Sequence, residues 1–73
     1  MERIVSEPSI CGGKPTIYGT RIMVRNILDV LALDGSIEAV LTSYPDITRE
    51  DVQAALAYAG ELVDETVLVT KAS

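Results

Sequence analysis

A short glycine-rich segment followed by a lysine is the first place where this 73-residue chain offers a chemical motif. Gly12-Gly13-Lys14 is similar to the end of a phosphate-binding loop, in which backbone amides and a lysine hold nucleotide phosphates. That loop also needs a glycine five residues before its Gly-Lys pair and Ser or Thr directly after the lysine. Pro8 and Pro15 stand at these two positions, so the pattern favours a structural turn over a nucleotide site.

Cys11 is the single cysteine of the chain, and it would act as a nucleophile only beside a base that activates it. The chain has no histidine, which is the commonest such base. One cysteine without histidine provides no set of zinc ligands, and the acids follow no calcium-binding spacing. We therefore expect no enzymatic activity, no metal and no cofactor. A lone cysteine also favours the reducing cytoplasm, because it cannot form an internal disulfide.

Basic residues are concentrated near the N-terminus, although the net charge of the chain is −5. Residues 1–25 contain four basic residues and two acids, whereas residues 26–73 contain two basic residues and nine acids. Phosphate neutralisation dominates the affinity of proteins for DNA. Lys14, Arg21 and Arg25 are therefore the candidate phosphate contacts. The acidic remainder suits a basic protein partner equally well.

The segment that organises the chain is Ser36–Glu61, which reads as two amphipathic helices joined by a tight turn. Apolar residues recur at helical spacing in both halves, first Ile37, Val40, Leu41 and Tyr44, then Val52, Ala55, Leu56 and Ala59. Pro45 ends the first of these helices near Tyr44. Thr48 and Asp51 form a capping-box pattern that starts the second, with Ile47 stapled to Val52. The pattern predicts a helix-turn-helix.

In DNA-binding helix-turn-helix proteins, the start of the second helix reaches base edges in the major groove. Here that start offers Thr48, Arg49 and Gln53, of which Arg49 suits guanine or phosphate and Gln53 suits adenine. Glu50 and Asp51 oppose this role because they repel phosphate. The alternative is that all these residues are helix caps and exposed positions of a bundle.

The rest of the chain completes a single domain, 1–73. Residues 1–9 are expected to form an extended arm, and residues 10–23 a β-hairpin with Gly12-Gly13 in its tight turn. A first helix spans 24–33 and ends at Gly35, so the helical bundle covers 24–63. Val30 and Leu33 widen the apolar face of that helix, either because it is deeply buried or because it meets a partner. Residues 64–73 form a tail, whose β-branched run 66–70 suits a strand.

Two runs of the sequence resemble the domain-of-unknown-function 433 family of short prokaryotic proteins. They are ICGGKPTIYGTRIMVRNIL (10–28) and SIEAVLTSYPDITREDVQAALAYA (36–59). The resemblance gives Gly12, Gly13, Pro15, Gly19, Thr20 and Arg21 as signature positions without a known chemical role. It implies a mostly α, homeodomain-like three-helix bundle preceded by a short N-terminal β-hairpin.

The resemblance also implies a function, the antitoxin of a type II toxin–antitoxin pair whose partner is a PIN-like ribonuclease. Neutralisation by direct binding would involve the C-terminal tail, where the candidate toxin contacts are Val67, Leu68, Val69 and Lys71. Binding to operator DNA would let the protein repress its own operon. The alternatives are a transcription regulator without a toxin and a structural dimer module.

Association of the chain with itself is expected because a core of this size supplies only about 3–5 kcal/mol of net stability. An exposed hairpin edge would also favour a homodimer or a higher homo-oligomer. No apolar run approaches the roughly 18 residues that cross a bilayer, so no membrane partner is expected.

Overall fold

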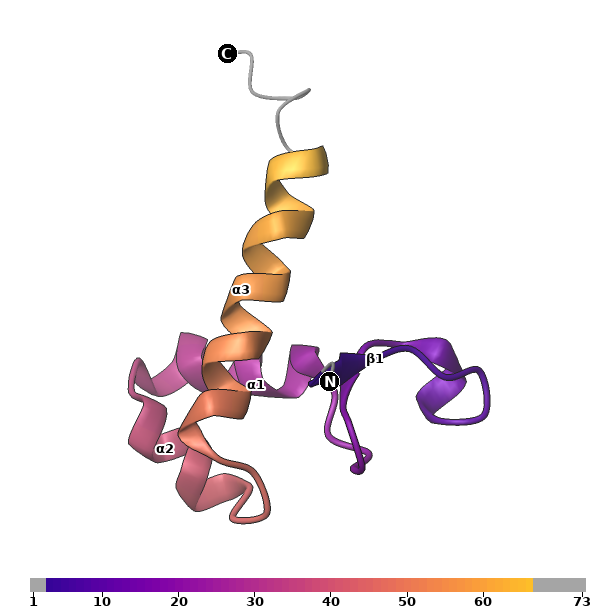
Figure 1. Cartoon of the computed structure of the whole chain (residues 1–73). Helices are drawn as coiled ribbons and strands as arrows, with labels where there is room; N and C mark the ends of the chain where they lie inside the picture. The colour runs from indigo at the N-terminus through magenta and orange to yellow at the C-terminus, as the bar shows by residue number, and fades with distance from the viewer. Residues whose placement is uncertain (1–2, 67–73) are drawn as a thin grey trace.

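The computed structural model describes residues 3–66 and shows three helices preceded by a small β-ribbon (Figure 1). Strands β1 (Ile4–Val5) and β2 (Thr16–Ile17) pair antiparallel, and a 3₁₀ turn, η1 (Cys11–Gly13), lies between them. Helices α1 (Val24–Asp34), α2 (Ile37–Ser43) and α3 (Arg49–Thr66) follow. None of the helices in this part of the chain is long and apolar enough to cross a membrane.

One core joins all of these elements except η1. Ile17 comes from β2, Val24 and Ile27 from α1, Val40 from α2, and Ile47, Val52 and Ala55 from the turn and α3; all seven are buried. The N-terminal half of α3 packs on α1 and α2, whereas its C-terminal half extends beyond them (Figure 1). The predicted mostly α three-helix bundle with an N-terminal β-hairpin is confirmed.

The predicted helix boundaries are confirmed where local caps set them. Ser36 begins α2 by accepting a hydrogen bond from the Ala39 amide at 3.1 Å. Thr48 and Asp51 form the capping box at the start of α3, with backbone-to-side-chain bonds of 3.0 and 3.2 Å. Gly35 ends α1 in the left-handed conformation, at φ 85°. Each of these devices acts within four residues, which explains why the sequence alone predicts them.

The hairpin prediction for residues 10–23 is wrong in its first strand and in its turn. The partner of β2 is Ile4–Val5, within the predicted arm 1–9, with Ile4 opposite Ile17 and Val5 opposite Thr16. Gly12 and Gly13 have positive φ, as expected, but they belong to η1 within a long connection. The pairing joins residues more than ten positions apart, so local turn residues could not specify it.

The predicted end of the last helix also changes. Helix α3 runs to Thr66, three residues past the predicted bundle boundary at 63. The candidate toxin contacts Val67, Leu68, Val69 and Lys71 lie outside the described residues.

On the wide face of α1, Val30 packs against the core, whereas Leu33 is 89% exposed. Partial burial against the core therefore explains Val30 but not Leu33.

Candidate functional site

At the start of α3, where a DNA-reading helix would carry free charge, Arg49 and Asp51 are both engaged by contacts within the chain. Arg49 donates a hydrogen bond to Glu38 of α2, with 2.8 Å between Nη2 and Oε2. This bond from Arg49, together with a backbone hydrogen bond and the guanidinium charge, lowers the pKa of the Glu38 carboxyl. Arg49 is thus engaged by α2 rather than held ready for a nucleic acid.

Asp51 is the second charged residue that α3 uses internally. Its side chain is only 13% exposed and accepts hydrogen bonds from the Thr48 amide at 3.0 Å and from Arg3 Nη1 at 2.8 Å. Burial opposes ionisation of Asp51, but the bonds from Thr48 and Arg3 outweigh it and lower the pKa of the carboxyl. The contact ties the N-terminal segment to α3. Sequence analysis missed Arg3, because nothing local relates residues 48 positions apart.

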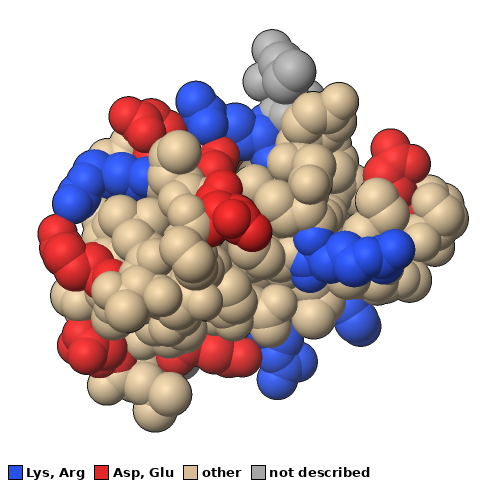
Figure 2. Space-filling view, turned by 90° about the horizontal axis from the view of Figure 1, so that it is seen from below, with Lys and Arg blue, Asp and Glu red and all other residues tan. Residues whose placement is uncertain are grey.

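The six candidate DNA contacts do not gather into one surface. Thr48, Arg49 and Gln53 are exposed along the start of α3, beside Glu50, which is also exposed. Lys14 and Arg25 line one groove, whereas Arg21 lines a separate depression. On the face seen in Figure 2, basic and acidic side chains alternate rather than form a continuous basic patch. Such a surface provides little of the electrostatic attraction that DNA binding needs.

The signature segment builds a rigid turn between β2 and α1. The Ile17 amide donates to the Ile22 carbonyl at 2.9 Å, and the Thr20 hydroxyl donates to the Ile17 carbonyl at 2.8 Å. The Ile22 amide in turn donates to Thr20 Oγ1 at 3.0 Å. Gly19 has φ 82°, a conformation that favours glycine. These bonds and this conformation give Gly19 and Thr20 a structural role.

Two side chains of this turn face outward. Tyr18 is 58% exposed, and Arg21 is exposed and forms no ion pair within residues 3–66. They line an open depression of about 920 Å³, together with Ile10, Gly19, Thr20, Ile22 and Asp46. The backbone carbonyl of Arg21 accepts a hydrogen bond from Cys11 Sγ at 3.6 Å. Its side chain is exposed and can contact a partner. Sequence analysis did not single out Tyr18.

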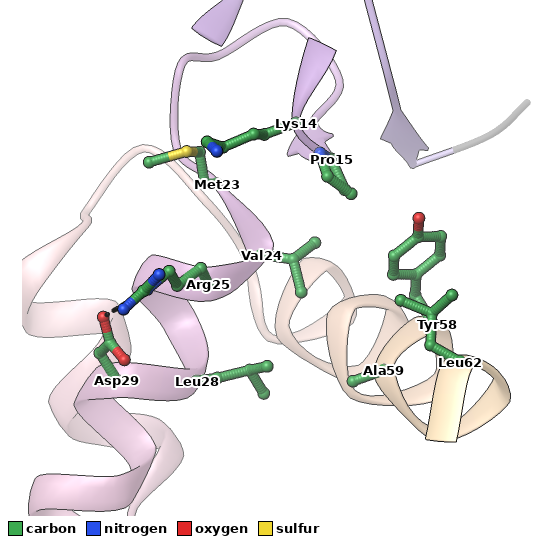
Figure 3. A pocket seen from close by; sticks show the side chains of 10 residues that line it. All are labelled: Lys14, Pro15, Met23, Val24, Arg25, Leu28, Asp29, Tyr58, Ala59 and Leu62. Atoms are coloured by element: carbon green, nitrogen blue, oxygen red, sulfur yellow. Dashed lines mark ion pairs between the residues drawn. The ribbon is translucent and has the colours of Figure 1, made fainter. Parts of the chain in front are cut away.

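A second hollow lies between the start of α1 and the C-terminal half of α3 (Figure 3). It has a volume of about 510 Å³. Val24 and Leu28 of α1 face Tyr58, Ala59 and Leu62 of α3 across it, and Pro15 and Met23 complete its apolar lining. Lys14, Arg25 and Asp29 lie on the α1 side. We call this the α1–α3 groove.

Two kinds of chemistry raised by the sequence, metal binding and a reactive Cys11, can be examined in the described part of the chain. No cluster of three or more Cys, Asp or Glu side chains that could hold a metal ion occurs in residues 3–66. Cys11 is half-buried, and the neighbour of its Sγ, the Arg21 carbonyl, cannot act as a base toward it.

Comparison with known proteins places the chain in a family. The model of the family described as "Protein of unknown function (DUF433)" matches residues 4–59. An uncharacterized protein, y4eO, from Sinorhizobium fredii (strain NBRC 101917 / NGR234) is 34% identical over 58 residues, which are 80% of this chain and 26% of that protein. The chain therefore spans about a quarter of the length of this relative.

A solved structure is also similar to this fold. It is the crystal structure of a DUF433 member protein from Anabaena variabilis ATCC 29413, with a TM-score of 0.80 and 29% sequence identity. The match covers 89% of this chain and 64% of that one. The family model covers most of the chain and the three-dimensional likeness extends over nearly all of it, so the protein belongs to the DUF433 family.

Proposed function

We propose that this protein is a non-catalytic antitoxin that neutralises a PIN-like ribonuclease toxin in the cytoplasm by direct binding. The observation that carries the proposal is the rigid turn at residues 17–22, which presents the exposed Tyr18 and Arg21. Tyr and Arg are enriched among the residues that dominate protein–protein binding energy. Because the turn is fixed by its own hydrogen bonds, little conformational freedom is lost when these side chains bind.

The charge of Arg21 suits the proposed partner. A PIN-type active site holds acidic residues and metal, and a guanidinium makes strong, paired hydrogen bonds to carboxylates. Arg21 would therefore block such a cleft by contacting its acids.

Co-expression with the product of the adjacent gene tests the proposal. We expect the two proteins to purify together and the toxicity of the partner to be relieved. Arg21→Glu is expected to abolish both effects, and Tyr18→Ala to weaken them. Lys14→Glu is the control, because Lys14 is also an exposed basic residue but lines the separate α1–α3 groove. Failure of the unaltered chain to bind the partner or to relieve its toxicity contradicts the proposal.

The rival function, a transcription regulator without a toxin, makes a different prediction. It requires saturable, salt-sensitive binding to the promoter of the chain's own gene, with a steep loss on Arg21→Ala or Arg25→Ala. We expect fluorescence anisotropy with labelled promoter DNA to show only weak binding that does not depend on sequence. Arg49→Ala should leave it unchanged, because the start of α3 carries more acid than base, with Glu50 and Asp51 directly after Arg49.

A further inference from the structure

The α1–α3 groove exposes apolar side chains that the core of the protein covers on one side only. Leu28 and Tyr58 pack against the core but are only half-buried, and Leu62 is 45% exposed. Figure 1 shows the cause, because α3 crosses α1 and then rises above it. The groove is thus a corner between the start of α1 and the rising half of α3 (Figure 3). Removing these apolar side chains from water favours the binding of a partner.

The main-chain groups beside the groove are already used within the chain. The Pro15 carbonyl accepts a hydrogen bond from the Val24 amide at 3.0 Å, and the Met23 carbonyl accepts one from the Asn26 amide at 2.9 Å. The Met23 amide donates to Asn26 Oδ1, also at 2.9 Å. An extended peptide needs a free sheet edge, whereas an amphipathic helix binds an apolar groove through its side chains. The groove therefore suits a helix.

Charge is placed on one wall of the groove only. Lys14 and Arg25 stand on the α1 side, whereas the residues of the α3 wall are uncharged. Lys14 is exposed and makes no ion pair within the described part of the chain. Arg25 pairs with Asp29 at 3.7 Å, but both side chains are largely exposed, at 80% and 62%. An exposed pair of this kind contributes little, so Arg25 can exchange Asp29 for the carboxylate of a partner.

The excess of positive charge in the groove is opposite in sign to the net charge of the chain, which is −5. Charges are largely screened beyond about 8 Å at physiological ionic strength. A carboxylate bound in the groove therefore responds mainly to Lys14 and Arg25. Two cations beside apolar walls are too few for a nucleic acid, whose affinity depends on the neutralisation of many phosphates. An acidic segment of a protein matches both the charge and the apolar lining.

We propose that the α1–α3 groove binds an amphipathic helix of a partner protein, with the apolar stripe of that helix in the groove and its acidic flank against Lys14 and Arg25. The helix lies along α1 and contacts the side of α3 with its uncharged flank. This inference goes beyond the antitoxin function, because Tyr18 and Arg21 belong to a separate depression. A chain that fails to bind any toxin still binds this helix.

The first experiment uses a fluorescein-labelled synthetic peptide as the probe. Its leucines recur at spacings of three and four residues, and glutamates occupy one flank of the helix that it forms. Fluorescence anisotropy with the full chain is expected to give saturable binding in the micromolar range. The matched control peptide has glutamine in place of each glutamate and should bind at least about threefold more weakly. Absence of saturable binding up to about 1 mM, or equal binding of the two peptides, overturns the proposal.

A substitution on the α3 wall locates the bound peptide. Leu62→Glu should weaken binding by at least about tenfold, because it places a carboxylate in the apolar wall. Leu33→Glu is the control, since Leu33 is 89% exposed and does not line the groove. Circular dichroism checks that both variants fold. Equal binding by the two variants would place the peptide outside the groove and contradict the proposal.

Two substitutions on the α1 wall are expected to act in opposite directions. Lys14→Glu should weaken binding of the glutamate peptide by at least about fivefold, because it replaces attraction by repulsion. Asp29→Asn should strengthen it by about twofold, because Arg25 is released to the peptide. Damage to the fold would weaken binding in both variants. Changes of the same sign, or none, would show that the acidic flank does not meet these cations.

A second copy of the chain is the rival occupant of the groove, and mass in solution distinguishes it. Sedimentation equilibrium is run at the protein concentrations of the anisotropy measurements. We expect Leu62→Glu to reduce peptide binding without changing the mass of the chain. A dimer that Leu62→Glu dissociates, and with which the peptide does not compete, would assign the groove to a second copy and overturn the proposal.

Discussion

The two ends of α3 use their side chains in opposite ways. At its start, Thr48 and Asp51 cap the helix, Ile47 and Val52 are buried on either side of the cap, and Arg3 holds Asp51 at 2.8 Å. At its end, the helix leaves the bundle with Leu62 and Val63 both more than 40% exposed. Polar residues therefore serve the fold at the start, while apolar residues are left exposed at the end.

This difference reverses what a helix-turn-helix leads one to expect. In a DNA-binding motif the start of the second helix carries the recognition residues, and they must be free to reach the bases. Here Arg49 and Asp51 are engaged by Glu38 and Arg3. The start of α3 is thus a structural joint, and the surfaces available to a partner lie elsewhere, at the end of the helix and on the turn before α1.

Shortening a valine at each end of α3 provides the sharpest test of this contrast. Val52 is fully buried, so Val52→Ala removes two methyl groups from the core and leaves a cavity. We expect the free energy of unfolding to fall by about 2 kcal/mol, a large part of the stability of a domain this small. Val63→Ala should change it by less than about 0.5 kcal/mol in the monomer.

Urea denaturation measures both variants, at a protein concentration low enough to keep the chain monomeric, because dimerisation would add to the apparent stability. Similar losses at the two positions would show that the end of α3 is packed as tightly as its start, and the contrast would fail.

Removing the cap of α3 should have the next largest effect. Thr48→Ala takes away the hydroxyl that accepts the Asp51 amide at 3.2 Å. We expect a loss of about 1 kcal/mol, the usual cost of replacing a threonine cap by alanine. Thr42→Ala is the control, since Thr42 is an exposed residue within α2. Thermal unfolding followed by circular dichroism compares the two; equal melting temperatures would mean that the cap adds nothing.

The same contrast explains which parts of the structure the sequence could predict. Caps, turns and helical faces depend on residues within about four positions of one another, so Ser36, Gly35 and the pair Thr48 and Asp51 were assigned correctly. The fold class followed from them, because three short amphipathic helices with tight connections have few ways to bury one core.

Contacts between distant residues could not be predicted in this way. The pairing of Ile4 with Ile17 moved the first strand out of the predicted hairpin 10–23, and the Arg3–Asp51 contact had no local signal. The grouping of the candidate binding residues also depends on contacts between distant parts of the chain. Lys14 and Arg25 share a groove while Arg21 lines another hollow, although all three belong to one basic stretch of sequence.

The smallest expected effect concerns acid, and it tests the charge of Asp51, which accepts hydrogen bonds from both the Thr48 amide and Arg3. The folded-state pKa of Asp51 is lowered from 3.8, because the hydrogen bonds from Thr48 and Arg3 favour the carboxylate more than burial disfavours it. A lowered pKa means that the contribution is fully present above about pH 4 and is lost as the pH falls through the folded-state value. The unaltered chain should therefore lose stability between about pH 5 and about pH 3, and Asp51→Asn should lose less, by up to about 1 kcal/mol.

Glu50→Gln is the matched control, because the neighbouring Glu50 is exposed and forms no ion pair within residues 3–66. Urea denaturation at both pH values decides the matter: if Asp51→Asn and Glu50→Gln lose stability equally on acidification, Asp51 does not anchor the start of α3 by its charge.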